Sequence, residues 1–437
     1  MSIAFPFLTL ADPPGTSEGR LDPLGLYQIA DLLATQLVPS VRERMVRVRF
    51  LTAMAVGALV TERFEADPRQ RESLPYLAWE WHVVEAIVRS PDATDARGGT
   101  GGVPGIGVTR RAVRQHECLD ARTYLATPRV FGFNGIYKRL AIHFGLTDVH
   151  LAPGPNAGRL VDAWNRDRRR AGLVEADTLI SRWRTAVERA LNQSPPTTRP
   201  GWNREAWEDL AHAFLPGMAG ANERKLLHEW LTTRGDGRLG ALPDIWDLVE
   251  GAPGEDLSER DLHERLERAD PGLGAILAAI RGYEQFSRAL QDAFDTIRFV
   301  AGHDDARGFF LPSIATKAEF RSAIDTLRSG FQQTAEALAA VPAKPIALEP
   351  LFTRRFATFA EPLAPEDAAR AIFKLHDSVQ RDKSATGKRL WFDDLGGERI
   401  HVRHDYRLEA FEPKPEAYLH AYRGQPIRRF RNDLVRR

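Results

Sequence analysis

Three His-Asp pairs are the residues of this chain whose types could hydrolyse a bond. They are His303-Asp304, His376-Asp377 and His404-Asp405, and His401 lies three residues before His404. Histidine and carboxylate ligands that leave one coordination position open can hold a metal ion that activates water. However, a strand would send the side chains of His401 and His404 to opposite faces, and the pattern assigns no further ligands. A metal-dependent hydrolase or nuclease that uses these pairs is therefore an alternative function and not the favoured one.

Other catalytic schemes have weaker support. Cys118 is the single cysteine, and Glu117 beside it disfavours a reactive thiolate. The glycine-rich run Gly98–Gly107 is not followed by the Lys-Ser or Lys-Thr of a phosphate-binding loop. We therefore predict no catalytic residue, no metal ligand and no cofactor. One cysteine also excludes an internal disulfide, which is typical of a cytoplasmic protein.

Basic residues give the clearest chemical signal. Between Arg110 and Arg170 there are twelve lysines and arginines against five acidic residues. Cations clustered on one face release counterions from phosphates and supply most of the non-specific affinity for nucleic acid. The predicted DNA-contacting residues in this region are Arg110, Arg111, Arg114, Tyr137, Lys138, Arg139, Arg166, Arg168, Arg169 and Arg170. A second predicted group consists of Lys383, Lys388, Arg389 and Arg403.

Two local patterns would position these cations. Residues 135–144 form a short predicted helix that ends at Gly145, and a turn and a helix through Trp164 follow, which resembles a helix-turn-helix. In the C-terminal part, a helix that starts at Pro365 precedes two short strands at 390–392 and 399–402. That order of elements is typical of a winged helix.

A seven-residue apolar repeat runs through 276–301 and again through 320–341. This period keeps two helices in register, so the two segments are predicted to form a coiled-coil-like antiparallel hairpin, within one chain or between two chains. Before them, residues 244–270 hold ten acidic residues against three arginines. The commonest role of such a segment is a solvated surface.

The chain of 437 residues is long enough for several cores. We predict a mainly α-helical, multi-domain protein with a long helical hairpin and a small winged-helix-like β element. A capping box at Ser40 and Glu43 predicts the start of a long buried helix, and Gln193–Pro200 is the clearest linker. The predicted domains are an N-terminal helical domain at 1–192, a domain with the acidic segment and the hairpin at 201–341, and a C-terminal helix, β-wing and basic tail at 351–437.

No membrane association is expected from the sequence. The apolar run from Phe50 to Val60 is about half as long as a bilayer-spanning helix requires. The N-terminal MSIAFPFLTLADPP lacks a basic residue ahead of its apolar run, so it is a poor signal peptide.

Two stretches carry a resemblance to known proteins: GFNGIYKRLAIHFGL at 132–146, followed by LVDAW, and LHDSVQRDKSATGKRLWFDD at 375–394. They resemble mostly helical accessory subunits encoded in bacterial antiphage defence operons. The resemblance implies a complex subunit that works beside a separately encoded ATPase, helicase or nuclease. Together with the basic clusters, it predicts a non-catalytic DNA-binding accessory subunit, with a purely protein-binding scaffold as a further alternative.

Overall fold

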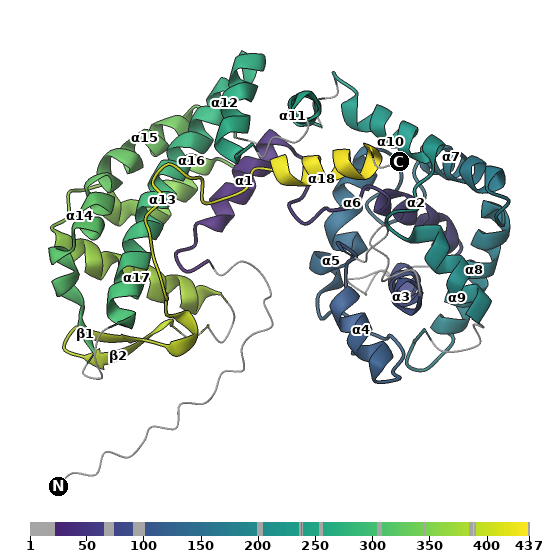
Figure 1. The fold of residues 1–437 in the computed structure, drawn as a ribbon, viewed down its shortest axis with the longest axis horizontal. Helices are drawn as coiled ribbons and strands as arrows, with labels where there is room; N and C mark the ends of the chain where they lie inside the picture. The colour runs from purple at the N-terminus through teal and green to yellow at the C-terminus, as the bar shows by residue number, and fades with distance from the viewer. Residues whose placement is uncertain are drawn as a thin grey trace, which may run out of the picture. The chain divides into compact units, whose positions relative to one another are not determined.

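The computed structural model describes residues 22–64, 74–90, 101–198, 204–235, 237, 239–252, 257–303, 308–343, 346–383, 388 and 390–435. In these residues the chain forms eighteen α-helices and one three-stranded antiparallel sheet, which confirms the mainly α-helical prediction (Figure 1). None of the described helices combines the length and the apolar character needed to cross a membrane. The prediction for the first residues, MSIAFPFLTLADPP, lies outside the described part.

The chain divides into two compact units, and each unit is built from two separate stretches. Unit 1 contains the described residues up to Leu33 together with Gly274–His420, and unit 2 contains Ala34–Leu273 together with the residues from Ala421 onward. The first boundary falls inside α1 (Tyr27–Leu37). This division differs from the three consecutive ranges 1–192, 201–341 and 351–437, because segments distant in sequence pack together in each unit.

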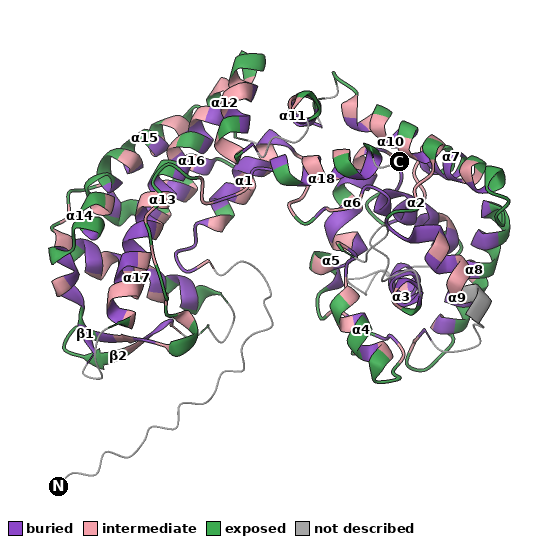
Figure 2. Cartoon of the chain, viewed as in Figure 1, coloured by how far each residue is buried: buried purple, intermediate pink, exposed green. Residues whose placement is uncertain are grey.

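All the regular elements described in unit 2 are helices, joined by loops. Its helices are α2 (Phe50–Thr61), α3 (Leu74–Arg89), α4 (Ile106–Arg114), α5 (Pro128–Phe131), α6 (Phe133–His143), α7 (Ala157–Arg170), α8 (Ala176–Leu191), α9 (Arg204–Phe214), α10 (Ala221–Thr232), α11 (Leu242–Gly251), α12 (Glu259–Ala269) and α18 (Gly424–Val435). Helix α2 is the centre of this unit, since it is apolar on all faces and packs on α3, α6, α7 and α8 (Figure 2). The predicted helix start at Ser40 is wrong: residues 38–49 form an irregular loop, and the helix begins at Phe50.

A buried ion pair ties α2 to α10. Arg49 and Glu223 lie 2.8 Å apart with side chains 2% and 0% exposed. The Thr52 hydroxyl donates to the same carboxylate at 2.5 Å, and Arg49 donates to the carbonyl of Ala213 at the end of α9. These bonds compensate for the cost of removing both charges from water.

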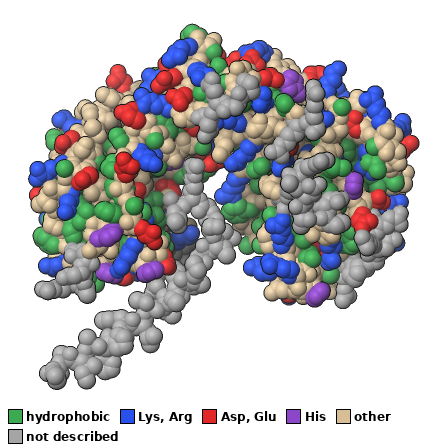
Figure 3. All heavy atoms as spheres, in the orientation of Figure 1, with side chains coloured by type: hydrophobic (Ala, Val, Ile, Leu, Met, Phe, Trp, Pro, Cys, Tyr) green, Lys and Arg blue, Asp and Glu red, His purple; other side chains and the backbone are tan. Residues whose placement is uncertain are grey.

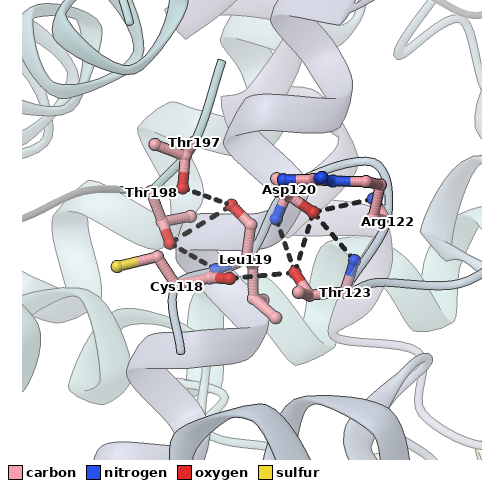
Figure 4. Close-up of polar contacts among 7 residues, drawn as sticks. All are labelled: Cys118, Leu119, Asp120, Arg122, Thr123, Thr197 and Thr198. Carbon is pink, nitrogen blue, oxygen red and sulfur yellow. Dashed lines mark hydrogen bonds and ion pairs between the residues drawn. The ribbon is translucent and has the colours of Figure 1, made fainter. Parts of the chain in front are cut away.

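The predicted linker at 193–200 is fixed to the body of unit 2 as far as the structure describes it, to Thr198. The Leu119 N–H donates to the hydroxyl of Thr198 at 2.9 Å, and the hydroxyl of Thr197 donates to the Leu119 carbonyl at 3.0 Å (Figure 4). The Thr198 hydroxyl donates in turn to Glu85 at 2.5 Å. Because these contacts hold the segment in place, it does not separate two domains.

Unit 1 is organised around one long helix. Its elements are α13 (Gly274–Gly302), β1 (Phe309–Phe310), α14 (Ala318–Asp325), α15 (Leu327–Ala339), α16 (Leu348–Phe356), α17 (Pro365–Asp382), β2 (Phe392–Gly396) and β3 (Arg399–Val402). Helices α14 and α15 both pack on α13, as the apolar repeat predicts, although the second predicted helix is interrupted at Thr326. A Cβ on Gly282 would lie 3.5 Å from the Cα of Thr334, and one on Gly330 would lie 3.6 Å from the Cα of Phe286. This order of neighbours shows that the hairpin is antiparallel and forms within one chain.

The sheet has the order β1-β3-β2, with Ile400 of the central strand paired to Phe309 on one side and to Asp394 on the other. The predicted strand at 399–402 is confirmed, while the strand predicted at 390–392 begins at Phe392 and runs to Gly396. Strand β1 comes from a different part of the chain and was not predicted. Helix α17 and strand β3 both pack on α13, so the helix and the β-hairpin are part of unit 1 and do not form an isolated winged helix.

An extended segment, which we call the strap (residues 406–420), runs along α13 in the opposite direction. Arg298 donates to the Tyr406 carbonyl at 2.7 Å, and Arg288 donates to the Ala417 carbonyl at 3.0 Å. Near the start of α13, Glu284 accepts from the backbone N–H of His420. Side chains of one helix therefore bind several backbone groups along the strap.

Candidate nucleic-acid interface

Helix α6 carries the central predicted residues and has two distinct faces. Phe133, Tyr137 and Leu140 are buried toward α2, where the ring of Phe50 meets that of Phe133 edge-on at 4.7 Å between centroids. Asn134 and Lys138, spaced by one helical turn, lie on the other face. The helix ends before Gly145, whose φ of +66° is the left-handed conformation that glycine favours.

The polar face of α6 forms one wall of a cavity of about 490 Å³, which we call the basic pocket. Arg42 enters from the loop 38–49, and Arg129 enters from α5. The lining residues are Arg42, Thr127, Arg129, Val130, Asn134, Gly135, Lys138, Arg139 and Ile142. Four of these described lining residues are cationic and none is acidic, so the lining carries a net positive charge.

Lys138 is a cation of the pocket whose position is fixed by a hydrogen bond. It is half-buried, and its Nζ donates to the Val149 carbonyl at 2.5 Å. Burial lowers the pKa of Lys138, Asp148 opposes this shift, and Arg129 adds to it by like-charge repulsion. Arg129 thus lies within electrostatic range of Lys138, although the nearby Asp148 has the larger effect on the charge of this lysine.

Tyr137, a predicted DNA contact, is buried and so does not present its side chain at the surface. Its side chain is 0% exposed, and its phenol oxygen accepts from the backbone N–H groups of Val46 at 3.0 Å and Arg47 at 3.1 Å. Burial raises the pKa of this phenol. Tyr137 is therefore a positioning residue, since it fixes the loop that carries Arg42 against α6.

Arg168 is the second predicted DNA contact whose side chain is buried in the structure. It is 5% exposed, its Nε donates to the Val174 carbonyl at 2.8 Å, and its guanidinium lies 5.1 Å from the ring centroid of Trp164. Burial lowers its pKa to about 10. The neighbouring Arg166, Arg169 and Arg170 are exposed, and Arg169 pairs with Glu175 at 2.6 Å.

Helices α6 and α7 do not form a helix-turn-helix motif. Both pack on α2, and the described residues show no extensive packing between them, which the motif requires. Arg110, Arg111 and Arg114 of α4 are exposed. Figure 3 shows Lys and Arg side chains gathered over the part of unit 2 that α4 and α5 form. The exposed predicted cations of α4 and α7 are thus separate surface residues and not parts of a recognition helix.

The second predicted group belongs to unit 1 and is largely engaged in internal bonds. Lys383 donates to the Asp22 carbonyl at 2.6 Å, and Arg403 pairs with Asp393 at 2.8 Å. Lys388 is exposed, and Arg389 lies outside the described residues. The hairpin itself carries Asp393, Asp394 and Glu398, which oppose phosphate binding.

The His-Asp pairs do not assemble a metal site in the described part of the chain, where no group of three or more His, Cys, Asp or Glu is placed to hold an ion. His376 is buried: its Nδ1 donates to the Pro23 carbonyl at 2.9 Å, and its Nε2 accepts from the Trp391 N–H at 3.2 Å. Burial lowers its pKa to about 4, so it is neutral at physiological pH. His404 is 94% exposed and 3.7 Å from Asp405, and Asp304 lies outside the described residues.

A second cavity, of about 590 Å³, lies in unit 1 between α13, α14, α15 and the strap. Its charged lining residues are of both signs: Arg288 lies 3.6 Å from Asp292, and Glu319 is on the rim. This cavity lacks the uniform charge of the basic pocket.

Arg42 and Arg129 complete the basic pocket but were absent from the predicted set. Arg129 lies in the basic region of the sequence, nine residues before Lys138, and could have been included on charge alone. Arg42 lies between Ser40 and Glu43 of the predicted capping box, so the sequence placed it on a helix that does not form. A comparison of the chain with protein-family models, with curated proteins and with solved structures found no match in any of the three.

Proposed function

We propose that this protein binds DNA through unit 2 and catalyses no reaction of its own. The observation that carries the proposal is the basic pocket, in which Arg42, Arg129, Lys138 and Arg139 converge without an acidic lining residue among those described. Phosphates are the abundant cellular anions that such a cluster recognises, and arginine can bind them through two parallel hydrogen bonds. The exposed arginines of α4 and α7 add charge for backbone contacts.

The proposed setting is the cytoplasm of a bacterium, in a multiprotein system for antiviral defence. The protein would be an accessory subunit beside a separately encoded ATPase, helicase or nuclease. The support is the resemblance of residues 132–146 and 375–394 to such subunits, together with the DNA-binding chemistry proposed for unit 2. A purely protein-binding scaffold is the competing proposal, because the hairpin of α13, α14 and α15 could serve a protein partner equally well.

Fluorescence anisotropy with a labelled short DNA duplex tests the proposal. The test variant replaces Arg42, Arg129, Lys138 and Arg139 with alanine. The control variant replaces Lys317, Arg328, Arg354 and Lys374, which are exposed cations of unit 1, and loses the same formal charge. We expect the test variant alone to bind more weakly, with the salt slope of log K reduced by roughly 0.9 for each lost phosphate contact. Equal loss in both variants would show only non-specific attraction, and no binding by the unaltered protein at low salt would favour the scaffold.

A further inference from the structure

The basic pocket has the size of a small-ligand site. Its volume of about 490 Å³ lies within the range of cavities that hold drug-sized or cofactor-sized molecules. A whole duplex is too wide to enter such a cavity, so only a phosphate group of its backbone or of its end, with the attached nucleoside, can reach the four cations. The pocket therefore makes a different contact from the exposed arginines of α4 and α7.

The charge of the pocket matches a terminal phosphate better than an internal one. An internal phosphodiester carries a single negative charge. A phosphate monoester carries about −1.5 to −2 at neutral pH and presents three terminal oxygens. Four converging cations, with no acidic group among the described lining residues, correspond to the larger charge and the greater number of acceptors.

The start of α6 supplies a further polar element beside these side chains. Asn134 and Gly135 line the pocket and lie in the first turn of α6, where backbone N–H groups point out of the helix. Gly132 at the helix boundary has no side chain to cap them, and a Cβ there would collide with the buried Glu80 carboxylate, so the cationic side chains and not the helix start carry the recognition of an anion. A Cβ on Gly135 would lie 2.5 Å from the backbone carbon and oxygen of Arg129, so glycine at 135 allows α5 to pack closely against this turn.

From this geometry we infer that the basic pocket binds a phosphate monoester, the group found at the end of a nucleic-acid strand and on a free mononucleotide. The strand-end form of this inference rests on the proposed function. Lys138 is held in place by the Val149 carbonyl and contributes fixed charge, while the exposed Arg139, next to it on α6, adds a second charge. Arg42 and Arg129 approach from the loop 38–49 and from α5 and contribute guanidinium forks.

The experiment compares one oligonucleotide with a 5′-phosphate and with a 5′-hydroxyl, and adds a deoxynucleoside monophosphate and inorganic phosphate as competitors. We expect the 5′-phosphate to increase affinity roughly tenfold, as charge-assisted hydrogen bonds do. Changing Lys138 and Arg139 to methionine should abolish that difference. Changing the exposed Arg110 and Arg111 to methionine should lower the affinity for both oligonucleotides and preserve the difference.

The outcomes separate the two proposals. If both oligonucleotides bind equally and the monophosphate does not compete, the inference is overturned while DNA binding stands. If neither oligonucleotide binds but the monophosphate binds the unaltered protein and not the Lys138 and Arg139 variant, the pocket is a mononucleotide site and the DNA proposal fails. If no phosphate compound binds, both are overturned.

Discussion

Glu284 of α13 and His420 at the end of the strap form a buried pair, with Oε1 and Nδ1 2.7 Å apart and side chains 1% and 5% exposed. The same carboxylate accepts from the backbone N–H groups of Leu419 and His420. A single side chain thus satisfies three donors of a segment that has no regular secondary structure. This makes Glu284 the main anchor of the strap's end.

We expect Glu284→Ala to release the end of the strap, because it leaves these donors without their acceptor. The free energy of unfolding should fall by about 2–3 kcal/mol. Hydrogen exchange at residues 417–420 should accelerate more than exchange elsewhere in unit 1. Glu284→Gln, which keeps one acceptor oxygen, serves as the control, and unchanged exchange in the alanine variant would refute the anchoring role.

Tyr137→Phe should weaken phosphate binding without a change in charge. The variant keeps the buried ring and removes the oxygen that accepts from Val46 and Arg47, so the loop that carries Arg42 loses its fixed position. We expect a stability loss of about 1–3 kcal/mol and faster hydrogen exchange at 42–47. Tyr124→Phe removes a buried hydroxyl bonded to Glu80 and is the matched control. Equal effects of both variants on binding would contradict the assignment.

Replacing Arg168 should lower stability, whereas replacing Arg170, two residues later on the same helix, should weaken DNA binding. Arg168→Ala removes packing over Trp164 and the hydrogen bond to Val174, so chemical denaturation should show a loss of about 1–3 kcal/mol. Arg170→Ala should leave stability nearly unchanged and reduce the salt slope of DNA binding by up to roughly 0.9. The reverse result would mean that Arg168 reaches the ligand.

Glu223→Ala should be among the most damaging single changes in unit 2. It leaves Arg49 buried without its ion-pair partner, which costs about 3–5 kcal/mol. Replacing both residues, with Arg49→Met and Glu223→Leu, should recover much of that loss, since no isolated charge remains. Urea unfolding followed by tryptophan fluorescence measures both variants. A double variant as unstable as Glu223→Ala would show that the ion pair itself is required.

The stability of unit 1 should fall in mild acid. The pKa of His376 is lowered by burial to about 4, against an ordinary value of 6.5. Between these values the unfolded chain binds the proton and the folded protein does not, so stability present above pH 6.5 is lost as the pH falls towards 4. The expected loss is roughly 3 kcal/mol. His376→Asn should flatten this dependence and the exposed His404→Asn should not, and equal pH profiles for the two variants would exclude His376 as the cause.

The periodic parts of the fold could be predicted from the sequence. The apolar repeat located α13 and its partners, because Tyr283, Phe331 and Leu338 are buried as the repeat requires. The helix that ends at Gly145 could be predicted for a similar local reason. Strand β1 and the strap could not, since both depend on contacts between residues about 90 to 135 positions apart.

Arg168 and Tyr137 were predicted as DNA contacts and are buried. The spacing of the apolar residues around them already indicates this burial, which a count of charges does not take into account. Arg168 lies one turn after Trp164 on the apolar stripe of α7, and Tyr137 lies on the buried stripe of α6 next to Ile136. Helical spacing alone therefore places both side chains inward. The position of Arg42, by contrast, depends on a loop that Tyr137 fixes through the backbone, which no local pattern reveals.

The main chain passes between the two units three times, after residues 33, 273 and 420. Neither unit can therefore be produced as one continuous expression fragment. A fragment that stops at 273 would lack α18, and with it Asp433, whose carboxylate accepts from Val48 and pairs with Arg47. A single protease cut at any one of these crossings would also leave the two halves covalently joined, so separating them requires all three connections to be broken.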